Sequence, residues 1–484
     1  MLNFEAALST FGDLVKYLAV RCINLLYFHP LSQYPGPKVA AVSIIWYAYH
    51  WLSGRYPWAV EEAIKKYGDA VRIAPNELVF MTPQAFDDIH TSHIKHHETF
   101  IKTDINDRGD DHGGIANPRS HTSKEPTMHK YVDLFIERME TMTVAADSVN
   151  FADWSNWLAM DVSAELTYNC QMNQLKNMQN SLYLDVVMGF NKYTTIEQVS
   201  LRFPLLKRFK RKLLPLSTLT SIPEMIWASR AEMQRRLSQG GNTEYPDFFE
   251  QLVPINGTIP NDPKELRHLE QVAAQLLFAG YQPVAAWLFG IVMYLLAEPH
   301  VYKILCEEIR GSFHSYDELV PKDLASLPFL NAVLQETLRI FPISIIGLPR
   351  ISPGVQVDGS YIPQRVYCQT SLFARSRSPK YFHEPLKFRP QRFLPSDHPL
   401  YEDEYSGDDL KNLHPFNIGP RACIGKEVAW RLTRLFMAKM LWKFDLVRGP
   451  GRELQFERDF IGYGFWIKPE LKVRFERRGE ACIK

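Results

Sequence analysis

The chain has 484 residues, of which 46% are hydrophobic and 23% charged, so it can bury a large core. Its 55 basic and 54 acidic residues give a net charge of +1, which excludes an extended basic surface for nucleic acid. Six scattered cysteines without a Cys-x-x-Cys pair argue against a disulfide scaffold and against a zinc site, and they fit a reducing compartment.

The N-terminal segment is apolar but interrupted by charges. Residues 11–28 contain Asp13, Lys16 and Arg21, whereas a clean membrane span has about 20 mostly apolar residues. The pattern indicates either an amphipathic helix packed on the protein or a short anchor with snorkelling cations. The stiff run Pro-Gly-Pro at 35–37 ends any helix. We therefore predict a membrane-associated helix and hinge over 1–34 and one catalytic unit over 35–484.

Two further segments invite a binding hypothesis. His90, His93 and His97 share one face of a helix, but no fourth ligand is visible, so we interpret them as ordinary histidines and not as a metal site. The run 205–215 mixes lysines and arginines with large apolar residues. It is typical either of a solvated helix face or of membrane contact.

A long apolar helix is predicted in the middle of the chain. Residues 271–297 carry no charge, which by hydropathy alone would suggest a membrane span. Three glutamines and an internal proline favour a helix through a protein core instead. We place its start near Pro263, with Asp262 as the cap. Pro283 should remove one helical hydrogen bond and kink the helix.

Downstream of this helix, the pattern becomes mixed. Residues 328–342 predict a helix ended by Pro342, on which Glu336 and Arg339 share a face. Alone, such a pair is a common surface ion pair. Residues 355–362 predict a short hairpin that turns at Asp358 and Gly359.

The most informative motif is Phe-x-x-Gly-x-Arg-x-Cys-x-Gly over residues 416–425. A cysteine thiolate can ligate haem iron, and Cys423 is the candidate iron ligand. Phe416 would shield its sulfur, and Arg421 could pair with a haem propionate. Gly419 allows a tight turn, and Gly425 allows close approach to a flat macrocycle. A helix over 427–440 would direct its positive end at the sulfur, although a buried structural cysteine would also be possible.

This motif resembles the cysteine loop of the cytochrome P-450 superfamily. The helix with Glu336 and Arg339, and Arg392 in the segment 388–393, stand in the family's order. The resemblance implies that these three residues form a buried ion triad below the haem. It also implies the fold class: mainly α with a small β portion, with the long central helix over haem b. The N-terminal hinge resembles fungal secondary-metabolism members, such as the trichothecene hydroxylases.

The resemblance also assigns residues around the haem. Arg350 would pair with a propionate, and Ile343, Ile345 and Ile346 would line an apolar pocket, with the loop 460–464 as a second wall. Ala279 and Gly280 match the small pair that makes room for dioxygen beside the cofactor. Gln282 stands at the family's acidic, catalytic position, and Pro283 and Val284 replace its hydroxyls. Glutamine orients water but does not transfer a proton as a carboxylic acid does.

One family element has no room in this chain. The family places a helix with a Trp or His and an Arg for the propionates before the segment that here reads 130–139. Residues 117–126 lack space for about four helical turns, roughly 15 residues. Arg119 and His121 stand in this short segment. If the segment is as short as written, one haem edge has fewer cationic partners.

Three functions follow as hypotheses. The leading one is a monooxygenase that oxidises a lipophilic polyketide- or terpenoid-like intermediate of fungal secondary metabolism. The second is a haem-thiolate isomerase, dehydratase or peroxide-using enzyme, and the third is a haem-deficient relic. By resemblance, electrons come from NADPH-cytochrome P-450 reductase docked near Lys426, Arg431 and Arg434. The resemblance also implies dioxygen as co-substrate and the cytosolic face of the endoplasmic reticulum membrane, through a weak N-terminal anchor.

Overall fold

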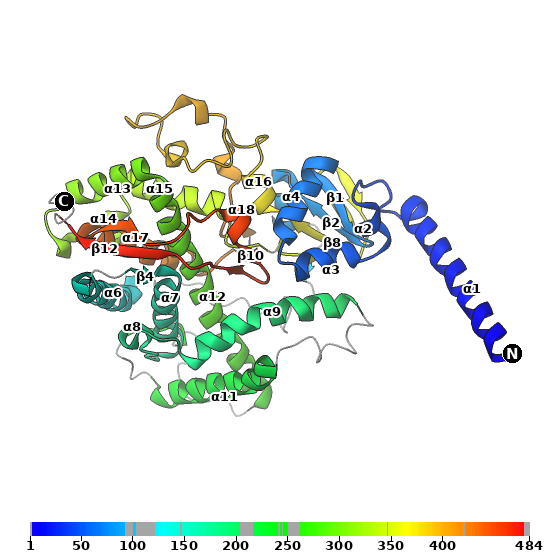
Figure 1. Cartoon of the computed structure of the whole chain (residues 1–484), viewed down its shortest axis with the longest axis horizontal. Coiled ribbons are helices and arrows are strands. Elements are labelled where there is room, and N and C mark those ends of the chain that lie inside the picture. The colour runs from blue at the N-terminus through cyan, green and yellow to red at the C-terminus, as the bar shows by residue number, and fades with distance from the viewer. Residues whose placement is uncertain are drawn as a thin grey trace.

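A computed structural model describes residues 2–91, 100–102, 122–145, 148–203, 216–240, 243, 245–249, 262–345, 347–419 and 422–478. Most of the described chain is helical (Figure 1). The helices that enclose the main core are α6 (Glu125–Ala145), α7 (Phe151–Tyr168), α12 (Pro263–Ala297), α13 (Pro299–Ser312), α15 (Pro328–Ile340) and α17 (Lys426–Lys443). The predicted class, mainly α with a small β portion, is confirmed.

The remaining helices are shorter or lie at the periphery of this core. They are α1 (Leu2–Ile23), α2 (Lys38–Val42), α3 (Ile45–Leu52), α4 (Tyr56–Tyr67), α5 (Pro83–Thr91), α8 (Gln174–Asn177), α9 (Leu182–Arg202), α11 (Leu216–Gln239), α14 (Pro321–Leu324), α16 (Leu372–Ser376) and α18 (Phe456–Asp459). The segment 130–139 lies in α6, and the helix predicted over 427–440 is α17.

The β portion gathers mainly beside the N-terminal helices (Figure 1). Its largest sheet has the order β1-β2-β8-β5-β3 and combines parallel and antiparallel pairs. These strands are β1 (Ala70–Ala74), β2 (Glu77–Phe80), β8 (Tyr367–Thr370), β5 (Arg350–Ile351) and β3 (Ile101–Lys102). The other strands are β4 (Val149–Asn150), β12 (Lys472–Arg477), β9 (Phe444–Arg448), and the hairpin pairs β6 (Val355–Val357) with β7 (Ser360–Ile362) and β10 (Ile461–Gly462) with β11 (Trp466–Ile467).

The predicted hairpin at 355–362 is confirmed, since β6 and β7 pair in antiparallel register from Val355 opposite Ile362. Asp358 and Gly359 form the turn, with φ of 49° and 75°. Positive φ at both central residues is the geometry that lets a two-residue turn follow the twist of its strands.

The N-terminal hinge is fastened to β1. Helix α1 extends away from the rest of the chain (Figure 1), and a five-residue π-helix (Asn24–Phe28) follows it. Arg72, which is 1% exposed, donates from Nη1 to the Leu25 carbonyl at 2.8 Å and from Nη2 to the Pro75 carbonyl at 2.7 Å. The Arg72 backbone N–H donates to the Pro35 carbonyl at 2.9 Å. Hydrogen bonds from Arg72 to Leu25 and Pro35 therefore hold the segment between these two residues against the sheet.

Helix α12 has the predicted limits. It begins at Pro263, and Asp262 caps it by accepting the Lys264 N–H at 3.0 Å. It is the one helix in the described chain that is long and apolar enough to cross a membrane, but most of its apolar stretch is buried inside the protein. It packs along α7, whose residues are almost all buried. The interpretation as a core helix is thus confirmed.

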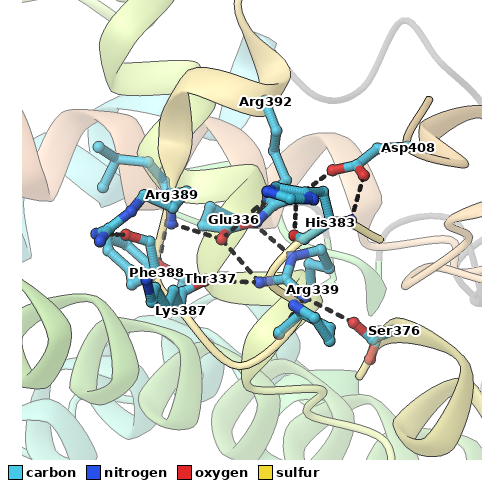
Figure 2. A network of polar contacts seen from close by, with 12 residues as sticks. Glu336, Thr337, Arg339, Ser376, His383, Lys387, Phe388, Arg389, Arg392 and Asp408 are labelled. Atoms are coloured by element: carbon cyan, nitrogen blue, oxygen red, sulfur yellow. Dashed lines mark hydrogen bonds and ion pairs between the residues drawn. The ribbon is translucent and has the colours of Figure 1, made fainter. Parts of the chain in front are cut away.

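A buried ionic network joins α15 to the segment near residue 392 (Figure 2). Glu336 accepts from Arg339 Nε at 2.6 Å and lies 3.2 Å from Arg392 Nε, and all three side chains are fully buried. Arg392 also pairs with Asp408. Backbone carbonyls also accept hydrogen bonds from the Arg339 guanidinium, including that of Ser376 at 2.6 Å. The predicted triad is therefore present in the structure, although Nη2 of Arg392 has no hydrogen-bond partner among the described residues.

Candidate functional site

The cysteine loop is folded tightly onto itself. The Cys423 N–H donates to the Phe416 carbonyl at 2.7 Å, and the Ala422 N–H donates to the Gly419 carbonyl at 3.0 Å. Gly419 has φ of 72°, a left-handed value that glycine adopts without strain. This geometry supplies the tight turn predicted for Gly419, and it brings Cys423 to the start of α17.

The sulfur of Cys423 meets the N-terminal end of α17. Cys423 is an exposed residue, but the surrounding protein still raises the pKa of its thiol by desolvation. The backbone N–H groups of Gly425 and Lys426 donate to the sulfur and lower that pKa. These are the first donors of the helix, where the helix dipole favours negative charge. A metal cation at the sulfur would outweigh the desolvation that raises the pKa of this thiol, because a coordinating thiol is deprotonated.

Phe416 ties this loop to the central helix. Its ring packs against Trp287 of α12 at 6.0 Å between centroids and against Trp430 of α17 at 6.3 Å. Trp287 in turn donates from Nε1 to the Leu334 carbonyl of α15 at 3.2 Å. Sequence reasoning missed both tryptophans; Trp287 is a bulky residue inside the charge-free run of α12, whereas Trp430 lies among charged residues of α17. The contacts of Phe416 with Trp287 and Trp430 therefore fix the position of the cysteine loop relative to α12.

Around residues 279–283 of α12, exposed and buried positions lie side by side. Ala279 is exposed and Pro283, one turn later, is half-buried, whereas Tyr281 and Gln282 are buried. A methyl group added at Gly280 would collide with Oγ of Ser163 on α7, and that hydroxyl donates to the Leu277 carbonyl at 2.8 Å. Helix packing therefore accounts for the absence of a side chain at Gly280, and both Ala279 and Gly280 are exposed.

Pro283 changes the hydrogen bonding of α12 without ending the helix. The helix assignment continues unbroken from Pro263 to Ala297. Because proline has no N–H, the Ala279 carbonyl lacks its usual partner four residues on and is available to accept a hydrogen bond. The side chain of Gln282 makes no hydrogen bond with the described part of the chain, and its neighbour Tyr281 donates to Asn156 Oδ1 at 3.2 Å.

Arg350 lies on β5, 5% exposed. Its Nη1 donates to the Leu348 and Pro349 carbonyls, each at 3.2 Å. Among the described residues no carboxylate pairs with it, so its charge is buried without an anion. A buried guanidinium requires such a partner, and a propionate has the matching charge and planar shape. Arg421 and Ile346, two other predicted site residues, lie outside the described residues.

A small pocket with a volume of about 50 Å³ lies between the sheet and the cysteine loop. It is lined by Tyr56 and Phe86, by Ser344, Ile345 and Leu348 after α15, and by His414 and Asn417 before Cys423. Gly462, in the predicted second pocket loop, approaches Ile345 so closely that an added methyl group would lie 3.0 Å from its Cδ1. The two segments predicted to line the substrate pocket therefore meet.

The predicted reductase-facing cations have different environments. Lys426 is exposed at the first turn of α17. Arg431 pairs with Glu125 of α6, and Arg434 donates from Nε to Asn331 Oδ1 at 2.7 Å while it stacks over Trp430. Two of the three cations thus already have protein partners. Their role in docking stays a prediction.

The long central helix, the buried triad below it and a cysteine held at a helix N-terminus define a haem-thiolate protein. The family described as Cytochrome P450 matches residues 112–471. The cytochrome P450 monooxygenase TwmD of Talaromyces wortmannii is 48% identical over 479 residues, which cover 95% of this chain and 94% of TwmD. The cytochrome P450 monooxygenases poxC of Penicillium oxalicum and BOA3 of Botryotinia fuckeliana are 33% and 30% identical, covering 95% and 96% of this chain and 92% and 94% of their own.

This chain therefore belongs to the cytochrome P450 family. It is a haem-thiolate monooxygenase of fungal secondary metabolism, and as such it uses haem, a redox partner, dioxygen and a lipophilic substrate.

Proposed function

We propose that Cys423 is the axial ligand of haem b, and that the enzyme oxidises a polyketide- or terpenoid-like intermediate. The observation that carries the ligand assignment is the pair of N–H donors, from Gly425 and Lys426, directed at the Cys423 sulfur. Bound through a thiolate, haem supplies cleavage of the O–O bond of dioxygen. Arg350 would hold one propionate, and the apolar neighbourhood of Ile345 suits a lipophilic substrate.

The reduced, carbon monoxide-bound difference spectrum tests this assignment. We expect the strongly red-shifted thiolate band for the wild-type chain and its loss in Cys423→Ala. Cys306→Ala is the matched control, because Cys306 is buried on α13 and takes no part in the proposal. An unshifted band in the wild-type chain would contradict the thiolate assignment, and the absence of any band would favour a haem-deficient relic.

Proton delivery would use the chain's own groups on α12. Gln282 lacks a transferable acidic proton, and Pro283 has no hydroxyl. We propose that the Ala279 carbonyl, released by Pro283, accepts a hydrogen bond from a water that serves in place of the missing hydroxyl.

A second candidate function rests on the same departure. The buried Gln282 amide and Pro283 are compatible with a rearrangement or dehydration, or with peroxide use, without normal oxygen activation. Gln282→Glu combined with Pro283→Thr separates the candidates. A monooxygenase limited by proton delivery should turn over faster and release less peroxide, whereas an isomerase or dehydratase should not accelerate.

We further propose NADPH-cytochrome P450 reductase as the redox partner and the cytosolic face of the endoplasmic reticulum membrane as the location. Helix α1 and the turn after it expose large apolar side chains, which supports membrane contact; these are Leu14, Val15, Tyr17, Leu18, Val20, Ile23, Tyr27 and Phe28. Co-sedimentation with phosphatidylcholine vesicles tests the location. Asp substitutions at Leu14 and Leu18 should release the protein from the vesicles, and binding that persists would contradict the membrane location.

The redox partner has a separate test. Failure of NADPH plus NADPH-cytochrome P450 reductase to reduce the iron would exclude this reductase as the partner.

A further inference from the structure

His90 is a buried side chain without a partner. It stands near the end of α5 and is 5% exposed, and neither Nδ1 nor Nε2 has a hydrogen-bond partner among the residues that the structure describes. Buried polar atoms in native proteins are almost always hydrogen-bonded, so an orphaned pair in one ring requires an explanation. An imidazole has one donor and one acceptor when neutral, which suits it to hold an acidic group.

The ring lies next to a cation that also lacks an anion. Burial and the charge of Arg350 together lower the pKa of His90 to about 3, so the imidazole is neutral near pH 7. Arg350 itself uses Nη1 for two backbone carbonyls and meets no carboxylate in the described chain. An orphan N–H beside an unpaired guanidinium is the donor set expected around a carboxylate.

The position of His90 directs that donor set toward the cofactor. Phe86, one helical turn earlier on α5, contacts the His90 ring at 4.6 Å between centroids and stacks on His414 at 5.5 Å. His414 lies two residues before Phe416, and both Phe86 and His414 line the pocket beside the cysteine loop. Helix α5 therefore bridges the strand of Arg350 and the loop of Cys423.

We infer that His90 is a haem-binding residue, which donates a ring N–H to the propionate that Arg350 holds. The inference rests on the proposed binding of haem through Cys423. It would add a donor in a chain whose sequence over residues 117–126 is too short for the family's propionate-binding helix. The same ring belongs to the His90, His93 and His97 set, of which only His90 lies in the described residues, and here it would serve a carboxylate and not a metal.

Three readouts on the full-length holoprotein test this. For His90→Phe we expect haem transfer to excess apomyoglobin to be about tenfold faster, the scale of losing a supporting hydrogen bond around a metal centre. The ferric/ferrous midpoint potential should shift in the negative direction, because the propionate charge is less neutralised. The propionate bending band in the resonance Raman spectrum should also move. His90→Gln keeps an N–H donor, so its three readouts should lie between those of the wild type and those of His90→Phe. His300→Phe, at an exposed position on α13, should match the wild type.

Unchanged haem loss, potential and Raman band in His90→Phe would overturn the inference. So would faster haem loss with an unmoved Raman band, since that result would indicate altered packing of α5. The red-shifted carbon monoxide band must persist in the His90 variants. Its absence from the wild-type chain would refute the Cys423 assignment instead, and the two failures are therefore distinguishable.

Discussion

Arg202, the last residue of α9, pairs with Glu77 of β2, although 125 residues separate them. The guanidinium also lies over the rings of Tyr47, at 4.3 Å, and Tyr367, at 5.2 Å. Glu77 is 2% exposed, and its burial raises the pKa of its carboxyl while Arg202 lowers it. One buried ion pair thus fastens α9 to the sheet.

Removing the cation of this pair should destabilise the protein strongly. In Arg202→Met, Glu77 keeps Gln369 as a donor but loses its counter-charge. We expect the free energy of unfolding, from chemical denaturation, to fall by about 3–5 kcal/mol. Lys303→Met breaks an exposed pair with Glu307, 74% and 65% exposed, and should cost less than about 1 kcal/mol. Equal losses in the two variants would contradict this account.

The Glu336 triad gives a second prediction. In Glu336→Gln, Arg339 loses its only carboxylate partner in the described chain and remains fully buried. We expect a loss of about 3–5 kcal/mol, seen as low soluble yield and little protein with the thiolate band. Glu384→Gln breaks a partly exposed pair with Lys387 nearby and should express normally. A normal yield of Glu336→Gln would show that the triad is dispensable.

Gly280 gives a prediction about helix packing. Gly280→Ala places a methyl group against Ser163 Oγ, so the free energy of unfolding should fall by about 1–3 kcal/mol. Adding Ser163→Gly should recover part of the loss, which a double-mutant cycle would measure. Gly189 of α9 has nothing within 4 Å of an added methyl group, and Gly189→Ala should stabilise by about 0.5–1 kcal/mol. Additive effects of the 280 and 163 substitutions would rule out the contact.

Asp161 makes stability depend on pH. Burial raises the pKa of this fully buried carboxyl to about 6, against the lowering effect of the Gln174 and Leu175 N–H donors. The folded protein therefore holds this proton more tightly than the unfolded chain, and the associated stability is present near pH 4 and lost as the pH rises through 6.

Asp161→Asn should remove that dependence. Denaturant unfolding of both proteins at pH 5 and pH 7 is the measurement. The variant should gain stability relative to the wild type between these two values. A difference between the two proteins that is the same at pH 5 and pH 7 would contradict the assignment.

Features that depend on residues close together in the sequence could be predicted from it. The limits of α12 follow from Asp262, Pro263 and the length of the charge-free run, and the hairpin follows from its Asp-Gly turn. Both depend on neighbours in the chain. The triad was predictable because the spacing of Glu336, Arg339 and Arg392 resembles that of a family, not because their charges alone required burial.

Other features depended on contacts between distant segments. The reason for glycine at 280 is a serine on α7, and the pair of Arg202 with Glu77 leaves no local pattern. Arg431 was predicted as part of a docking face, but its partner Glu125 comes from α6, far away in sequence. An unbroken α12 across Pro283 likewise reflects packing against α7, which local propensity does not include.

The contacts of Arg72 with Leu25 and His29 mean that residues 24–34 are structurally part of the sheet that contains β1. A chain shortened to begin at residue 35 would keep the Pro75 carbonyl as an acceptor but would lose the Leu25 carbonyl and the His29 ring from around a guanidinium that is 1% exposed. Removing all of residues 1–34 to obtain a soluble enzyme would therefore leave an unsatisfied charge at the edge of β1. A shortened form that retains residues 24–34 would avoid that defect.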